Sequence, residues 1–115
     1  MSLDVFPDKN MLENSEMIIV DIRTKPEWRQ TGIVKDSECI TFFDARGHYD
    51  IRDFFKQIDA LGGKNIKIGL ICRTGSRTSQ VAQLMYEQGY NVKNLAGGVM
   101  KLLSDGYELS SYKSS

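Results

Sequence analysis

Hydrophobic and polar residues follow one another along the chain in blocks that predict alternating strands and helices. Short apolar runs rich in β-branched residues are typical of buried strands, and apolar residues repeated every three or four positions are typical of amphipathic helices. The expected strands span residues 3–6, 17–22, 38–42, 66–71 and 92–95. The expected helical segments span residues 8–14, 24–30, 50–61 and 99–104, with a further helix that begins after residue 77 and ends at Gly89.

This alternation predicts an α/β fold. Strands separated by helices form a largely parallel sheet, and the connecting helices cover both of its faces. We therefore expect a single three-layer domain over residues 1–108, followed by a flexible tail over residues 109–115. In a sheet of this kind, ligands bind beyond the carboxyl ends of the strands.

The central stretch combines a strand, a short loop and a helix, and it reads IKIGLICRTGSRTSQVAQLMYEQG. Its strand is apolar and ends at Cys72. In its helix, apolar positions at i, i+3, i+4 and i+7 predict one buried face. That face would comprise Val81, Leu84, Met85 and Gln88. Gly89 follows where a left-handed helix cap favours glycine.

The loop between strand and helix, Cys72–Arg77, predicts an anion-binding site with a reactive cysteine. A short loop that enters a helix directs several backbone N–H groups and the positive end of the helix dipole at one point. Arg73 and Arg77 add positive charge, and all of these features stabilise a thiolate, the nucleophilic form of cysteine. The candidate nucleophile is therefore Cys72, and its activation would be electrostatic because the single histidine, His48, is distant in sequence. The candidate substrate-binding residues are Arg73, Thr74, Gly75, Ser76 and Arg77. The alternative is that Cys72 is a small core residue at the end of a buried strand.

The charges of the chain cancel, with 15 basic and 15 acidic side chains among 115 residues. Nothing in this balance favours nucleic acid or an anionic membrane surface as a partner. No stretch approaches the roughly 20 apolar residues of a membrane-spanning helix, and the N-terminus does not resemble a signal peptide, so we expect a cytoplasmic protein. The two cysteines, Cys39 and Cys72, lack the paired spacing of a zinc site, and neither a metal nor another cofactor is expected.

The sequence CRTGSRT, placed directly after an apolar strand, resembles the active-site loop of the rhodanese-like sulfurtransferases. Two other segments resemble motifs of that family: Asp21-Ile22-Arg23 at the end of a strand and Leu95-Ala96-Gly97-Gly98 near the C-terminus. The resemblance runs from Met17 to Leu103. One departure is the segment 32–37, which lacks the histidine of the family's Gly-His-Ile-Pro-Gly-Ala motif.

The resemblance implies a sulfurtransferase that moves a sulfane sulfur from an anionic donor such as thiosulfate to a thiol or cyanide acceptor. Cys72 would carry the sulfur as a persulfide between the two half-reactions of a ping-pong cycle. Asp21 and Arg23 would support the loop by pairing with each other or bracing it. The expected partners are the small anionic donor and a thiol acceptor, which can itself be a protein, and the oligomeric state is left open.

Two other functions remain open on the residues alone. Cysteine phosphatases and arsenate reductases resemble Cys-x5-Arg, whereas four residues separate Cys72 from Arg77. The shorter loop makes a smaller ring of N–H groups, better suited to one sulfur atom than to an oxyanion. A non-catalytic domain that uses the loop for partner binding is the second alternative. Cys39 is interpreted as a core residue, with a disulfide to Cys72 as its alternative role.

Overall fold

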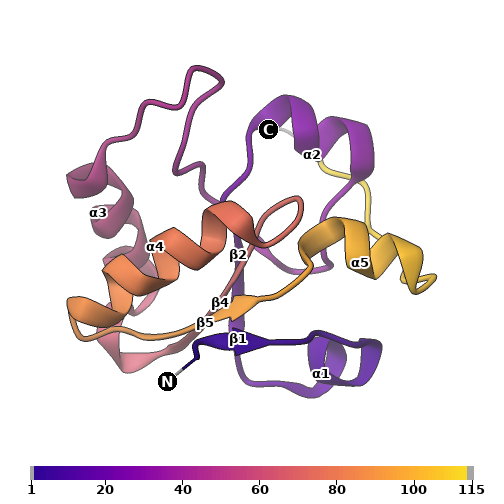
Figure 1. The fold of residues 1–115 in the computed structure, drawn as a ribbon, viewed down its shortest axis with the longest axis horizontal. Helices are drawn as coiled ribbons and strands as arrows, with labels where there is room; N and C mark the ends of the chain where they lie inside the picture. Colours follow the sequence, from indigo (N-terminus) through magenta and orange to yellow (C-terminus); the bar gives the residue numbers. More distant parts are fainter. Residues whose placement is uncertain (1, 114–115) are drawn as a thin grey trace.

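The structure, a computed structural model, describes residues 2–113 and contains a five-stranded parallel sheet (Figure 1). The strands are β1 (Asp4–Val5), β2 (Ile18–Asp21), β3 (Glu38–Cys39), β4 (Lys67–Ile71) and β5 (Asn91–Leu95). Their order across the sheet is β1-β5-β4-β2-β3, which places the apolar strand β4 at the centre. All pairings between these strands are parallel, as the alternation of strands and helices predicts.

Helices cover both faces of this sheet (Figure 1). They are α1 (Lys9–Asn14), α2 (Lys25–Thr31), α3 (Ile51–Leu61), α4 (Ser76–Glu87) and α5 (Gly98–Ser104), with a short 3-10 turn, η1 (Gly63–Asn65). Apolar side chains of α3 and α4 pack on one face of the sheet, and apolar side chains of α1 and α5 pack on the other. The predicted three-layer α/β domain is therefore confirmed.

Helix α4 has the predicted periodicity but buries a different face. Its buried residues are Thr78, Val81, Ala82 and Met85. The prediction that Leu84 and Gln88 belong to the buried face is wrong, because both are exposed to solvent. The helix turns Thr78 toward Cys72, and a stripe that begins at position 78 continues through 81, 82 and 85. Gly89 has φ +94°, as predicted for a left-handed cap.

The edge strand β3 is shorter than the expected strand 38–42. The chain nevertheless continues along β2, since the N–H groups of Ile40 and Phe42 donate to the carbonyls of Asp21 and Ile22. These bonds keep the segment close to the carboxyl end of β2, where Thr41 Oγ1 donates to the Arg23 carbonyl at 2.7 Å.

The last described residues contact the domain. Ser110 and Ile33 form an antiparallel bridge, with N–O distances of 2.8 and 2.7 Å. The Tyr112 ring lies 5.2 Å from the Trp28 ring, between centroids. The flexibility expected for residues 109–115 stays a prediction, and residues 114 and 115 lie outside the described part. Within residues 2–113, no helix has the length and apolar character needed to cross a membrane.

Candidate active site

The loop that carries Cys72 joins the central strand to a helix. Cys72 directly follows β4, and Gly75, with φ +94°, precedes the first residue of α4. Strand β2 ends at Asp21, which pairs in register with Ile71, the last residue of β4. Asp21 and Cys72 therefore lie at the same edge of the sheet, where parallel α/β proteins bind ligands.

The Cys72 sulfur is enclosed by its own loop. Only 1% of the residue is exposed. The Gly75 N–H donates to Sγ at 3.1 Å, and Thr78 Oγ1, in the first turn of α4, lies 3.4 Å from it. A backbone N–H at the start of a helix stabilises negative charge on the group it faces. The loop thus presents to Sγ the kind of donor that a thiolate or a persulfide needs.

Arg77, in the first turn of α4, forms an ion pair with Glu27 of helix α2. Its Nη2 lies 3.1 Å from Oε2 of Glu27, and its Nη1 lies 3.3 Å from Oε1. Partial burial opposes the charge on each group. For Glu27, the hydrogen bonds from Arg77 and Thr24 outweigh the effect of burial and lower the pKa. For Arg77, the hydrogen bond and the charge of Glu27 outweigh the effect of burial and raise the pKa. Both groups are therefore held in their charged forms.

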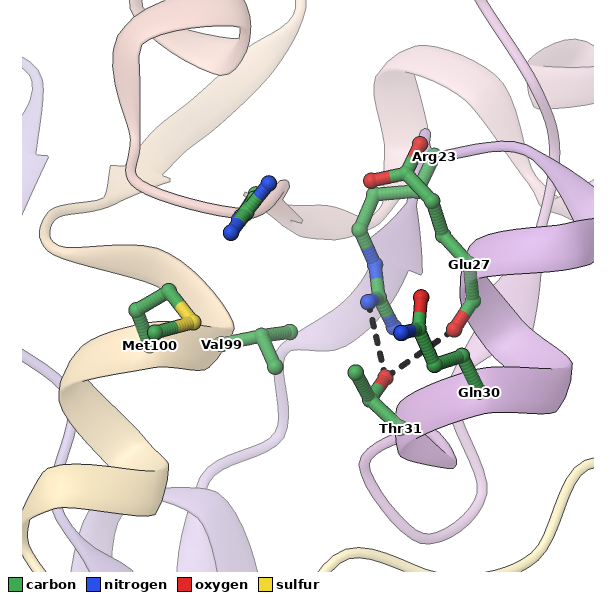
Figure 2. A pocket seen from close by; sticks show the side chains of 7 residues that line it. Arg23, Glu27, Gln30, Thr31, Val99 and Met100 are labelled. Atoms are coloured by element: carbon green, nitrogen blue, oxygen red, sulfur yellow. Dashed lines mark hydrogen bonds between the residues drawn. The ribbon is translucent and has the colours of Figure 1, made fainter.

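The second loop arginine, Arg73, lines a cavity of about 260 Å³ between α2 and α5 (Figure 2). The cavity is lined by Arg23, Glu27, Gln30, Thr31, Arg73, Val99 and Met100. Figure 2 shows the polar side chains of α2 on one side of this space and Val99 and Met100 on the other. Two guanidinium groups, a carboxylate and two neutral polar groups beside an apolar wall suit a small polar ligand.

Asp21 and Arg23 pair with each other, as predicted for one of their two supporting roles. Arg23 Nη2 lies 2.8 Å from Asp21 Oδ2, and neither side chain is more than 1% exposed. The same guanidinium also donates to Thr31 Oγ1 and to the Gly32 carbonyl. The pair thus fastens the C-terminal end of α2 to the end of β2, which fixes one wall of the cavity.

The other predicted loop residues lie around the sulfur without contacting it through their side chains. Thr74 and Ser76 are exposed, and the Thr74 hydroxyl donates to Ser76 Oγ at 3.3 Å. Gly75 is buried and contributes its backbone N–H. The structure thus places the Gly75 N–H against Cys72, pairs Arg77 with Glu27 and leaves Thr74 and Ser76 at the surface.

Helix α5 begins against the loop. The Val99 N–H donates to the Cys72 carbonyl at 2.9 Å, and the Met100 N–H donates to the Arg73 carbonyl at 3.0 Å. Gly98 has φ +58°, and a Cβ at this position would overlap both of those carbonyl groups. The glycine is therefore needed for the close approach of α5 to the loop, which the Leu-x-Gly-Gly pattern alone does not explain.

We expect Gly98→Ala to disturb the loop, with Gly106→Ala as its matched control. Both positions have positive φ, which costs a residue with a Cβ about 1–2 kcal/mol, but nothing lies within 4 Å of a Cβ at Gly106. The overlap at Gly98 adds about 1–3 kcal/mol. Urea unfolding of the two variants measures the difference, and equal losses of stability would contradict the close approach.

Three residues that contact the segment Cys72–Arg77 were not among the sequence candidates. Glu27 was missed because its partner, Arg77, is 50 residues away. Thr78 and Asn94 are buried polar residues beside the loop. Asn94 carried a usable signal, because it shares the inward face of β5 with Val92, where an apolar side chain is expected.

Cys39 lies on the far side of β2 from Cys72. Asp21 pairs with both Cys39 and Ile71, so two strand spacings, roughly 10 Å, separate β3 from β4. A disulfide requires Cα atoms within about 7 Å. The alternative role of Cys39 as a disulfide partner of Cys72 therefore does not fit this backbone. Burial and the nearby Asp21 charge raise the pKa of Cys39 to about 11, which also makes it a poor nucleophile.

The chain was compared with known families, curated proteins and solved structures. The family model of the rhodanese-like domain matches residues 9–105. The comparison with curated proteins found no match.

Two solved structures share the fold. A rhodanese-like domain protein from Staphylococcus aureus is 24% identical, with a TM-score of 0.70, over 96% of this chain and 100% of that one. A rhodanese-related protein from Thermoplasma volcanium is 18% identical, with a TM-score of 0.65, over 84% of this chain and 87% of that one. Since the family match spans most of the sequence, and the fold and the loop agree with it, this protein belongs to the rhodanese-like domain family.

Proposed function

We propose that this protein is a sulfurtransferase that carries a sulfane sulfur on Cys72. The proposal rests on one observation above all: the Cys72 sulfur accepts the Gly75 N–H at the start of α4. This contact stabilises a sulfur that bears negative charge, both before and after it takes up a second sulfur. Family membership supports the same reaction class.

The proposed reaction has two steps. The Cys72 thiolate attacks the outer sulfur of an anionic donor such as thiosulfate, a new S–S bond forms, and the old S–S bond breaks. Sulfite leaves with the electron pair of the broken bond, so Cys72 becomes a persulfide anion and the total charge is unchanged. A thiol or cyanide acceptor then attacks the outer sulfur and releases the Cys72 thiolate. The backbone N–H groups of residues 73–77 would hold the terminal sulfur between the two steps.

Both cysteines are free, which fits a reducing compartment such as the cytoplasm. The donor would be a small anion, and the acceptor a small thiol or a thiol-bearing protein. Because Cys72 is 1% exposed, a donor reaches its sulfur only after neighbouring side chains move.

Arg77 is the loop cation whose availability Glu27 controls. We expect Arg77→Ala to raise the KM for thiosulfate by about tenfold, because it removes a charged hydrogen-bond donor for the anion. We expect Glu27→Gln to lower that KM, because it releases Arg77 from its ion pair. Steady-state kinetics with varied thiosulfate separates the two, and a KM unchanged in Arg77→Ala would remove Arg77 from the donor site.

The same ion pair predicts a pH-dependent contribution to stability. The pKa of Glu27 is lower in the folded protein than its ordinary value of 4.5, so the unfolded chain binds more protons between these two values. The stabilisation is therefore complete above the ordinary value and is lost as the pH falls through the lowered one. Glu27→Gln has no such carboxyl group. Urea unfolding at several pH values should show that the free energies of unfolding of the native protein and of Glu27→Gln converge in acid. A difference in free energy that stays constant with pH would contradict the contribution of the ion pair.

Intact mass spectrometry after brief incubation with thiosulfate tests the proposed function. A persulfide adds one sulfur atom, ~32 Da, to the native protein and nothing to Cys72→Ser. The added mass should disappear when a thiol acceptor is supplied. A folded native protein that gains no mass from thiosulfate or from a persulfide donor would refute the proposal.

The burial of Cys72 favours one alternative, a rhodanese-like domain that binds a partner without catalysis. In that case Cys72 and the Arg77–Glu27 pair would serve to hold the loop in shape. Phosphatase or arsenate reductase activity is the weaker alternative, because only four residues separate Cys72 from Arg77. Persulfide formation excludes the non-catalytic domain, and an assay with a phosphate ester tests the phosphatase.

A further inference from the structure

A chain of hydrogen bonds connects the Cys72 sulfur to the surface of the protein behind the loop. Cys72 Sγ contacts Thr78 Oγ1, and Thr78 Oγ1 donates to Asn94 Oδ1. Asn94 Nδ2 in turn donates to Asp4 Oδ1 at 2.9 Å. Thr78 and Asn94 are 0% and 3% exposed, whereas Asp4 is exposed at the edge strand β1. Three secondary-structure elements, α4, β5 and β1, thus contribute one residue each to the chain.

The Asp4 carboxylate fixes the orientation of the Asn94 amide group in this chain. A carboxylate only accepts, so the amide group of Asn94 faces Asp4 and its oxygen faces Thr78. The Gly75 carbonyl accepts from both Asn94 Nδ2 and Thr78 Oγ1, which strengthens the same orientation. The single proton of the Thr78 hydroxyl is therefore directed to Asn94 and Gly75, and a lone pair of its oxygen faces the sulfur.

A Thr78 lone pair that faces the sulfur suits a thiol and opposes a thiolate. A Cys72 S–H can donate to Thr78 Oγ1, which satisfies both groups. When Cys72 is a thiolate, the hydroxyl must rotate to donate to it, and Asn94 Oδ1 then loses its donor inside the protein. The chain thus has two proton arrangements, one for each protonation state of Cys72.

We propose that Asp4, Asn94 and Thr78 are positioning residues that set how readily Cys72 ionises. The proposal rests on the proposed function, because ionisation of Cys72 matters only if its sulfur reacts. Asp4 orients Asn94, Asn94 orients the Thr78 hydroxyl, and the hydroxyl responds to the charge on the sulfur. Loss of Asp4 frees the Asn94 amide to turn, so that Thr78 donates to the thiolate without leaving a buried oxygen unpaired.

Other charged groups also surround Cys72 and must be held constant. They are Arg73 in the loop, Arg77 on α4 with its partner Glu27 on α2, and the Asp21–Arg23 pair beyond β2. All of them are retained in the variants below, so a change in ionisation comes from the hydrogen-bond chain or from the charge of Asp4 itself.

The experiment measures the thiolate absorbance of Cys72 in the ultraviolet as a function of pH. The full chain carries Cys39→Ser so that Cys72 is the only thiol, and the spectrum of a protein that also carries Cys72→Ser is subtracted. We expect Asp4→Ala to raise the thiolate fraction at neutral pH by about fivefold, the effect of one hydrogen bond. We expect Thr78→Val also to raise it, because the lone pair that opposes the thiolate is removed, and Thr78→Ser, which keeps the hydroxyl, to leave it near the native value.

The double variant Asp4→Ala, Thr78→Val separates the chain from a direct effect of charge. If Asp4 acts through Thr78, the double variant has the thiolate fraction of Thr78→Val alone. If the Asp4→Ala effect persists without the Thr78 hydroxyl, the charge acts directly and the proposal is overturned. It is also overturned if Asp4→Ala changes nothing, an outcome that needs no folded Thr78→Val protein. Because absorbance reports ionisation and not sulfur transfer, this result is independent of whether thiosulfate is a donor.

Discussion

Replacement of Cys72 by serine is expected to reduce sulfur transfer by at least about a thousandfold while the domain stays folded. A hydroxyl group is a far weaker nucleophile at neutral pH than a thiolate, and it cannot form a persulfide. The change is small in volume, and the Gly75 N–H and Thr78 contacts can be made by an oxygen as well as by a sulfur. The measurement is the rate of thiocyanate or persulfide formation from thiosulfate, together with the urea midpoint.

Cys39→Ser is the matched control for this variant, because Cys39 lies in β3 and has a raised pKa. It should retain nearly native turnover. If Cys39→Ser lost activity and Cys72→Ser kept it, the assignment of the nucleophile would be reversed. If neither variant changed a measurable rate, the observed transfer would not come from a cysteine of this protein.

Breaking the buried Asp21–Arg23 pair is expected to cause the largest loss of stability among the substitutions considered. Arg23→Met keeps much of the side-chain volume but leaves the Asp21 carboxylate without its cation, and both groups are at most 1% exposed. Removal of one member of a buried ion pair costs about 3–5 kcal/mol. This is a large part of the roughly 5–15 kcal/mol that holds a domain of ordinary stability together.

Lys101→Met supplies the comparison at the surface. Lys101 of α5 pairs with Asp105, the residue that follows this helix, with side chains 37% and 51% exposed, and such pairs contribute about 1 kcal/mol or less. Urea unfolding should therefore show that Arg23→Met loses several times more free energy of unfolding than Lys101→Met does. A loss of less than about 1 kcal/mol in Arg23→Met would show that water or another group compensates Asp21.

The opposing roles of the two ion pairs follow from their burial. Asp21 and Arg23 are closed off from solvent and fasten the end of α2 to the sheet. Glu27 and Arg77 join the same helix to the start of α4, but about a third of each side chain is exposed. The first pair is therefore structural, whereas the partly exposed second pair is the one that we propose to exchange Glu27 for an anionic donor.

Much of the fold followed from local patterns in the sequence. The apolar runs predicted all five strands, and Gly89 has the positive φ expected of a helix-ending glycine. The Cys72 loop was also evident, because it lies directly between an apolar run and a helical pattern. These features depend on residues close together in the chain, for which backbone geometry and side-chain period are sufficient.

The sequence by itself therefore determined the α/β class, the position of Cys72 at the end of an apolar strand and the presence of two nearby arginines. Only the tertiary structure decided that Arg77 pairs with Glu27, that α4 buries Thr78 in place of Leu84, and that Asn94 and Asp4 lie behind the sulfur. Such contacts join residues from different strands and helices. They depend on how each helix rotates against the sheet, and the 3.6-residue period restricts that rotation without fixing it.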